Sequence, residues 1–512
     1  MTSNAQACIK NSAIEPMYIS ELFNEGLDYA EHERWSEASE KYKKVIESIP
    51  DYPEAHFKLG VAMSHLGQVD EAISEYKNEL SLNPLNAKAL NNLGVIHDEL
   101  GCPDEAITYY KKAIEVDSKK VNTHVNIAQT YTSIGEFEPA NEHFGIAVSL
   151  DPEDAFNICL FGLSFWRLNK PEESIPLFEK AISIYPDDHS TYWHLAYALR
   201  VTGRFEEAIE SINKSLGFEP QDTDYLQELG AIQVCLDLRD EAMATFESIV
   251  SLDPENAEAY DSLAVEHYDK GNLEEALVMS EKSTIFDPDN DEFHTKRGWM
   301  LLNAGRYEEA QISFITATDL NPQNEEAYHG LGYALGETGN HMKAAHAFKK
   351  AVLADPECTL AQIDLGVALE NTGKINEAIS AYKRATQAKP DDIHAHFHLA
   401  TLYDRIGCSQ NAREVFQTIT ETPPKDGEDL FHIAFAYSEL ERYQDAIETY
   451  RKLIENEPDC TTAYFNMALC NLDSGDSKTA FEISKTLGFI DGAMARELRM
   501  IIGKPAKLFI TP

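Results

Sequence analysis

The chain has 512 residues, 43% of them hydrophobic, which is enough to bury an extensive core. It carries 87 aspartate and glutamate residues against 43 lysine and arginine residues, a formal net charge of −44 at pH 7. This charge repels nucleic acid and anionic membrane surfaces, so we expect neither as a partner, and it attracts basic proteins. It also helps to keep a long exposed surface soluble.

Residues 1–18 contain no charged segment followed by an apolar core, so we expect no signal peptide. No apolar run approaches the ~20 residues of a membrane-spanning helix. The eight cysteines are scattered without a CxxC pair, a pattern typical of reduced thiols in the cytosol. We therefore expect a cytoplasmic protein in which residues 1–18 are a lead-in or a partial cap.

From residue 19 to residue 494 the sequence repeats every 34 residues, and the unit Glu325–Cys358 shows the pattern most fully. Each half of the unit has an apolar stripe at helical spacing, with Gly339 between the halves and Pro356 at the end. The stripes consist of Tyr328, Leu331, Gly332 and Leu335, and of Ala344, Ala347, Phe348 and Ala351. A helix pair this short cannot bury both stripes alone, so it needs neighbouring copies of itself.

The register of this repeat is unbroken over fourteen units. Steps of 34 residues from Gly332 meet only glycine or alanine, and the position twelve residues later is alanine in every unit except at Ser174. Proline closes the units and is replaced only at Ser118 and Gly492. Glycine costs about 1 kcal/mol inside a helix, so its recurrence predicts a close helix–helix contact that larger side chains would block.

These positions resemble the signature of the tetratricopeptide repeat family, and the resemblance covers about nine-tenths of the chain. It implies an all-α fold in which antiparallel helix pairs stack into a right-handed superhelix, with the first helices lining a concave groove. It also implies a non-catalytic scaffold that binds other proteins. Since the flanking segments are too short for a catalytic domain, we expect no enzyme activity and no cofactor.

After the repeats, residues 492–503 have helical spacing with Leu498, Ile501 and Ile502 on one side. We assign residues 495–503 as a capping helix and residues 504–512 as a basic and apolar tail. These features also favour a second hypothesis, a structural scaffold that self-associates through its C-terminal end. A third hypothesis, an accessory subunit that recruits substrates to a separate enzyme, differs from the first only in its partner.

The aromatic residues on the first helices are the candidate peptide-binding residues. In the implied fold the second, fifth, ninth and twelfth residues of each first helix face the groove, and aromatic anchors there would bind a peptide. The alternative is that neighbouring first helices use the same rings to pack against each other. The predicted groove residues are Phe156, Trp166, Arg167, Trp193, Tyr197, Arg200, Tyr268, Trp299, Tyr333, Phe397, Phe431 and Phe435.

Acidic residues prevail at the second position of the first helices, so the expected ligands are basic segments that contain aromatic residues. Arg167 and Arg200 interrupt this charge beside Trp166 and Trp193. They would either bind a carboxylate of the ligand or neutralise nearby acids of the chain.

The histidines His394, His398 and His432 are one helical turn or one repeat apart, so they would lie close together. A zinc site or a pH-responsive patch is one interpretation, and a polar lining of the groove is the preferred one.

Overall fold

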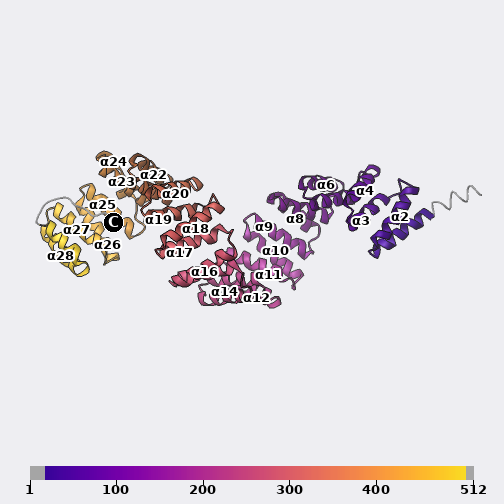
Figure 1. The fold of residues 1–512 in the computed structure, drawn as a ribbon, viewed down its shortest axis with the longest axis horizontal. Helices are drawn as coiled ribbons and strands as arrows, with labels where there is room; N and C mark the ends of the chain where they lie inside the picture. Colours follow the sequence, from indigo (N-terminus) through magenta and orange to yellow (C-terminus); the bar gives the residue numbers. More distant parts are fainter. Residues whose placement is uncertain (1–17, 503–512) are drawn as a thin grey trace, which may run out of the picture. The chain divides into compact units, whose positions relative to one another are not determined.

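The structure is a computed structural model, and it describes residues 18–502. Every regular element of this part of the chain is an α-helix, as Figure 1 shows. The predicted all-α solenoid is therefore confirmed. None of the helices between residues 18 and 502 combines the length and the apolar character needed to cross a membrane. Contacts along the chain divide it into two compact units, Met1–Pro254 and Glu255–Pro512.

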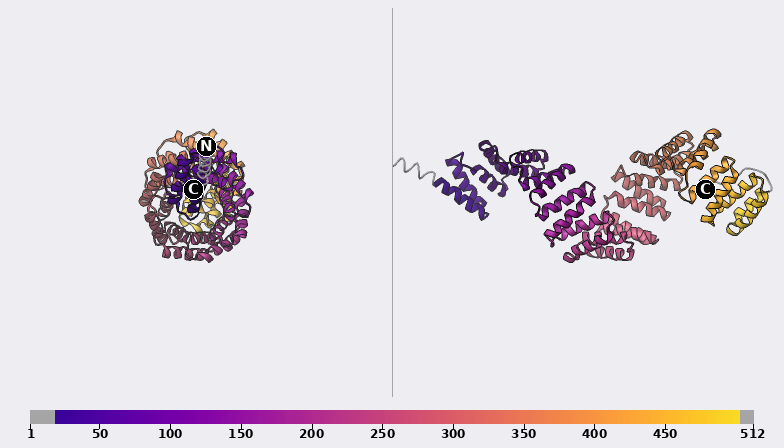
Figure 2. Two further views of the ribbon diagram at one scale, coloured as in Figure 1. Left: turned by 90° about the vertical axis from the view of Figure 1, so that its right-hand side faces the viewer. Right: turned by 180° about the vertical axis from the view of Figure 1, so that it is seen from behind.

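The first unit is a succession of helical hairpins, seen from two further directions in Figure 2. Residues 18–31 form its first described helix. The helices that follow are α2 (Trp35–Ser48), α3 (Ala55–His65), α4 (Val69–Leu82), α5 (Ala87–Glu99), α6 (Pro103–Val116), α7 (Val121–Ser133), α8 (Phe137–Leu150), α9 (Ala155–Arg167), α10 (Pro171–Ile184), α11 (His189–Val201), α12 (Phe205–Phe218), α13 (Thr223–Cys235) and α14 (Arg239–Leu252).

The second unit repeats the same arrangement, and within residues 18–502 a single helix, α29, follows its last hairpin. Its helices are α15 (Ala257–Asp269), α16 (Leu273–Phe286), α17 (Asp291–Asn303), α18 (Tyr307–Leu320), α19 (Glu325–Glu337), α20 (His341–Ala354), α21 (Thr359–Asn371), α22 (Ile375–Ala388), α23 (Ile393–Arg405), α24 (Ser409–Glu421), α25 (Gly427–Glu439), α26 (Tyr443–Asn456), α27 (Thr461–Asp473), α28 (Ser477–Ile490) and α29 (Gly492–Ile501).

Each hairpin spans one 34-residue repeat, and local sequence explains where its helices begin and turn. Asn324 precedes α19, and its side-chain oxygen accepts a hydrogen bond of 2.8 Å from the backbone N–H of Ala327. This cap satisfies a donor that the first turn of a helix leaves unpaired. Gly339 has φ +75° between α19 and α20, a left-handed conformation that glycine adopts without strain. Asn169 fills the equivalent turn between α9 and α10, with φ +56°.

The recurrent glycine of the first helices makes the close contact predicted from the sequence. A Cβ atom on Gly332 would lie 2.5 Å from Cε1 of Phe348, which belongs to the second helix of the same hairpin. The same pairing of glycine with an aromatic ring recurs at Gly26 and Tyr42 and at Gly162 and Phe178. Real Cβ atoms do not approach a ring this closely, so the glycine is what lets the two helices meet over a buried aromatic side chain.

The C-terminal helix covers the last hairpin. Ala495 and Leu498 of α29 are buried in a cluster with Phe465, Leu469 and Leu487 of α27 and α28. Asp491 caps this helix by accepting hydrogen bonds from the N–H groups of residues 493 and 494. The helix therefore begins at residue 492, earlier than the 495–503 assigned to the cap. Residue 503, the tail at 504–512 and the lead-in at 1–17 lie outside the described residues.

Candidate peptide-binding groove

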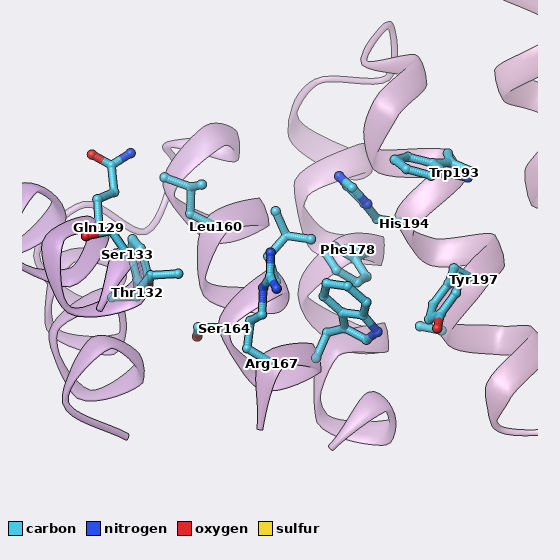
Figure 3. Close-up of a pocket in the computed structure, with 14 residues that line it drawn as sticks. Gln129, Thr132, Ser133, Leu160, Ser164, Arg167, Phe178, Trp193, His194 and Tyr197 are labelled. Atoms are coloured by element: carbon cyan, nitrogen blue, oxygen red, sulfur yellow. The ribbon is translucent and has the colours of Figure 1, made fainter. Parts of the chain in front are cut away.

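A cavity of about 630 Å³ lies in the first unit, on the three first helices α7, α9 and α11 (Figure 3). Phe144 and Phe178 of the second helices α8 and α10 also line it. Both phenylalanines are buried and occupy the aromatic position that recurs in the second helix of most repeats. The packed core therefore forms the floor of this cavity. The remaining lining residues come from the first helices and are Gln129, Thr132, Ser133, Leu160, Leu163, Ser164, Trp166, Arg167, Trp193, His194, Tyr197 and Ala198.

Aromatic side chains of α9 and α11 build one wall of this cavity, and Figure 3 labels those of α11, Trp193 and Tyr197. Trp166 meets Tyr197 edge to face, with ring centroids 5.6 Å apart. Trp193 lies next to His194, with centroids 4.9 Å apart, and it also touches Tyr225 of α13. Trp166 keeps 38% of its surface exposed, whereas Trp193 and Tyr197 are half-buried. The wall is therefore held by its own contacts and still offers apolar surface to a ligand.

The charge in this cavity is small although the chain is strongly acidic. Arg167 carries the only permanent charge among the lining residues, and its guanidinium lies 4.9 Å from the ring centroid of Trp166. Within residues 18–502 no carboxylate forms a salt bridge with Arg167. Burial lowers the pKa of His194, so this histidine is neutral near pH 7. The cavity thus combines an apolar surface with one cation that a ligand can reach.

Arg200 has a different role from Arg167. Its Nε donates a hydrogen bond of 2.7 Å to Oε1 of Glu228 on α13, and its Nη2 donates one of 3.1 Å to Oε2. Glu228 is buried, and this burial raises the pKa of its carboxyl group while the contact with Arg200 opposes the rise. Arg200 therefore neutralises an acid of the chain itself, the second of the two roles considered from the sequence. It does not line the cavity.

The other predicted groove residues lie elsewhere. Phe156 stands on the first turn of α9 and is 66% exposed, but it does not line the cavity. In the second unit, Trp299 packs against Tyr333 with ring centroids 6.1 Å apart. Tyr268 of the same unit contacts the side-chain amide of Asn303. These positions form no part of the cavity in the first unit.

Phe397, Phe431 and Phe435 are packing residues in the second unit. All three are buried, and Phe397 contacts Phe435 edge to face with centroids 5.3 Å apart. Packing between neighbouring first helices, the alternative considered from the sequence, describes Phe397 and Phe435, whereas Phe431 meets Tyr450 of the second helix α26 with ring centroids 5.8 Å apart. They present no open surface to a ligand.

The three predicted histidines lie together beside these rings. His394 and His398 approach with their Nε2 atoms 2.9 Å apart, and His432 stacks on His394 with centroids 5.7 Å apart. Between residues 18 and 502 no three histidine, cysteine, aspartate or glutamate side chains are placed to hold a metal ion. His432 is buried, and among the described residues its Nδ1 has no hydrogen-bond partner. The cluster is thus part of the packing between α23 and α25.

Sequence reasoning missed the residues that complete the cavity. Leu160 and His194 occupy the sixth position of two successive first helices, exactly one repeat apart, and Leu163 is the ninth residue of its helix. The sequence feature that could have indicated this cavity is a run of adjacent repeats in which the sixth and ninth residues of the first helix are apolar or aromatic. Aromatic type alone did not separate these repeats from those in which the rings are buried.

Sequence models of the tetratricopeptide repeat match residues 87–120, 159–223, 291–324, 329–393, 371–426 and 433–483, and a TPR repeat model matches residues 26–67. Together these segments cover more than half of the chain. The chain belongs to the tetratricopeptide repeat family. Proteins built from this repeat are in general non-catalytic scaffolds for protein–protein interaction.

A comparison with solved structures matches several proteins. Yeast Tom70 is 16% identical, covers 87% of this chain and 99% of its own, and has a TM-score of 0.39. The APC/C hetero-tetramer Cut9–Hcn1 is also 16% identical, with coverages of 96% and 98% and a TM-score of 0.41. YrrB, described as a TPR protein with an unusual peptide-binding site, is 23% identical, with coverages of 38% and 97% and a TM-score of 0.32. A comparison with curated proteins finds no match.

Proposed function

We propose that this TPR protein is a non-catalytic adaptor that holds peptide segments of partner proteins in the cavity on α7, α9 and α11. The observation that carries this proposal is an apolar cavity of about 630 Å³ with Trp166 on its wall and Arg167 beside it. An aromatic or aliphatic side chain of the partner fills the cavity, because burying such a group against Trp166 is worth about 2 kcal/mol at a binding hot spot.

Charge acts on the partner at two distances. At long range the net charge of −44 attracts basic segments and raises their association rate. At short range Arg167 binds a carboxylate or a backbone carbonyl of the segment, since its guanidinium has no ion-pair partner within residues 18–502. The preferred ligand therefore has an apolar anchor, with basic residues outside the cavity.

The proposed location is the cytoplasm. The seven cysteines that the structure describes are all free thiols, Cys102, Cys159, Cys235, Cys358, Cys408, Cys460 and Cys470. Free thiols suit a reducing compartment.

A peptide-display experiment tests the proposed function. A library of random peptides about 16 residues long, long enough for about four helical turns, is selected on the full chain. The recovered peptides are then measured against Trp166→Ala and Phe156→Ala by fluorescence anisotropy. Phe156 is the matched control, because it is an exposed aromatic residue of the same helix that does not line the cavity.

We expect a group of recovered peptides that contain an aromatic or aliphatic anchor. Trp166→Ala should weaken their binding at least about tenfold, roughly 1.4 kcal/mol or more, and Phe156→Ala should leave it unchanged. If every recovered peptide binds the Trp166→Ala variant as tightly as the original chain, the cavity is not the binding site.

Self-association through the C-terminal end is a second candidate function. Phe489 is 92% exposed on α28, and Met500 on α29 is 70% exposed, so the last two described helices present apolar side chains to solvent. Exposed apolar patches of this kind are found at protein interfaces. Light scattering of the full chain and of Phe489→Glu/Met500→Glu tests this. A mass above that of the monomer that falls in the variant supports self-association, whereas a monomeric original chain contradicts it.

A further inference from the structure

A second and larger groove lies in the second unit, around the second helices α18, α20 and α22 (labelled in Figure 1). Its volume is about 1490 Å³, and we call it the α20 groove. Between these second helices the groove is lined by residues of two first helices, Tyr328 and Leu331 of α19 and Leu365 and Leu369 of α21. Of these four residues, Leu365 and Leu369 are buried, so the groove reaches down to the core between successive hairpins.

The charge of the α20 groove is opposite to that of the chain. Its lining contains six cations, Lys343, Lys349, Lys350, Lys374, Lys383 and Arg384. Against these stand two carboxylates, Asp319 and Glu377, and Glu377 lies 3.7 Å from Lys374 in a local ion pair. Within residues 18–502 no salt bridge engages the other five cations. Cations without ion-pair partners on a chain of net charge −44 are not explained by solubility, which the acidic residues already provide.

Helix α20 contributes Lys343, Lys349 and Lys350 to this positive lining, and no acidic residue. It has the sequence HMKAAHAFKKAVLA and contains no aspartate or glutamate, whereas every other second helix from α2 to α28 contains at least one. The pair Lys349 and Lys350 is not itself unusual, because Lys43 and Lys44 occupy the same repeat positions in α2. In α2, however, Glu37, Glu40 and Glu47 accompany the lysines. The missing acids therefore distinguish α20, and the lysines alone do not.

Exposed aliphatic side chains line the same groove. Met342 is 72% exposed and Leu353 is 67% exposed, both on α20, and Ile315 of α18 is exposed as well. One repeat earlier, Glu308 and Asp319 occupy the positions of Met342 and Leu353. Apolar residues at positions that are acidic in the neighbouring hairpin give a surface that water solvates poorly.

We propose that the α20 groove binds an acidic amphipathic segment of a partner protein. The aliphatic side chains of that segment cover Met342, Leu353 and Ile315, and its carboxylates pair with Lys349, Lys350 and Lys383. This is the helix-in-groove type of recognition, in which apolar anchors give affinity and charges at the rim give selectivity. The proposal concerns other helices than the cavity on α7, α9 and α11, and it holds whether or not that cavity binds a ligand.

Two other occupants fit the groove less well. The tail KPAKLFITP of this chain carries two lysines and no acidic side chain, so its charge does not complement the groove. Nucleic acid would also pair with the lysines, but its phosphates and sugars would leave the exposed aliphatic side chains of Met342, Leu353 and Ile315 uncovered. An acidic amphipathic segment matches both the charge and the apolar surface.

The test uses the same random peptide library on the full chain, with two charge-reversed variants. Lys349→Glu/Lys350→Glu reverses the groove, and Lys43→Glu/Lys44→Glu makes the same change at the same repeat positions in α2. All four lysines are exposed, so both variants should fold, which circular dichroism confirms. A third variant, Leu353→Asp, probes the apolar surface alone. Affinities are measured by fluorescence anisotropy.

We expect recovered peptides that combine aspartate or glutamate with aliphatic residues. Their affinity should fall at least about tenfold in Lys349→Glu/Lys350→Glu and in Leu353→Asp, and by much less in Lys43→Glu/Lys44→Glu. Trp166→Ala should leave these peptides unaffected, which separates this result from the test of the cavity.

Four outcomes would overturn the proposal. The first is that every recovered peptide binds the two charge-reversed variants with equal affinity. The second is that the peptides whose affinity differs between these variants contain no aspartate or glutamate. The third is binding of a fluorescent mixed-sequence single-stranded DNA that Lys349→Glu/Lys350→Glu abolishes, which would make nucleic acid the occupant. The fourth is self-association, detected by light scattering, that disappears in the same variant, which would make the occupant a second copy of this chain.

Discussion

The cavity on α7, α9 and α11 and the α20 groove are built from the same repeat but use opposite helices of the hairpin. The cavity lies on first helices and is aromatic, with Arg167 as its only permanent charge. The groove surrounds second helices and is aliphatic, with six cations in its lining. The difference shows that one scaffold can offer two unlike surfaces, because each helix of a hairpin spends only part of its circumference on packing.

The two regions also differ in how their charges are used. Arg200, next to the cavity, forms a bidentate ion pair with the buried Glu228, so this charge is part of the folded structure. The exposed lysines of α20 have no such partners within residues 18–502. Removing a charge that supports the fold should lower stability, whereas removing a charge that is free to bind a partner should leave stability unchanged.

Removing Arg200 should have the largest effect. Arg200→Ala leaves the carboxylate of Glu228 buried without its partner, which costs about 3–5 kcal/mol of stability. Denaturant-dependent hydrogen exchange of α11 and α13 measures this loss locally. Lys349→Ala in α20 is the comparison and should leave unfolding unchanged. An Arg200→Ala variant that exchanges like the original chain would show that the pair contributes nothing to the fold.

Acidification should destabilise the part of the second unit that encloses His398 and His432. Burial lowers the pKa of His432 to about 3 and that of His398 to about 4, from 6.5. Below pH 6.5 these histidines become protonated in the unfolded chain, whereas in the folded chain they stay neutral down to about pH 4 for His398 and about pH 3 for His432. The free energy of unfolding therefore decreases as the pH falls through this window. We expect the stability of α23 and α25 to be constant above that range and to fall as pH drops through it.

The variant His432→Leu sharpens this prediction, since it removes one of the two titrating groups without charging the core. Its stability, followed by hydrogen exchange of α25, should depend less steeply on pH than that of the original chain. Equal slopes for both chains would contradict the assignment of the pH dependence to His432.

Raising the salt concentration should change the association rates of peptides at the two surfaces by amounts that differ several-fold. Physiological salt shortens the screening length to about 8 Å, so the attraction between acidic peptides and the lysines of α20 weakens. Cavity-binding peptides chosen without charged residues should be affected less, because neither the lysines of α20 nor the net charge of −44 acts on them. Stopped-flow measurements at low and physiological salt, on peptides of each kind from the library, give the comparison. Equal salt dependence would mean that the lysines do not select the ligand.

The turns next to the two regions should differ by the smallest amount. Gly339 has φ +75°, so Gly339→Ala places a side chain in a left-handed conformation and should cost about 1 kcal/mol. Asn169 tolerates the same conformation at φ +56°, so Asn169→Gly should change stability by only a few tenths of a kcal/mol. Thermal melts of the two variants measure both effects, and a larger change for Asn169→Gly would reverse the expected order.

The residues that the sequence predicts to line a peptide-binding groove lie in different environments in the structure. They include Trp166, Arg167, Trp193 and Tyr197, which the fold brings to one cavity. They also include, on the same grounds, Phe397, Phe431 and Phe435, and these are buried. An aromatic residue at the fifth or ninth position of a first helix can either line an open surface or pack against the next helix. The residue type does not decide between them, because both environments remove the ring from water.

The sequence by itself determined the all-α class, the 34-residue register and the contact of glycine with an aromatic ring, since each of these follows from residues within one or two repeats. Only the tertiary structure decided which surfaces remain open, that Arg200 is engaged while Arg167 is not, and that α20 forms part of a groove. These features depend on side chains that are a full repeat or more apart in the chain, and helical spacing fixes neither their distances nor their burial.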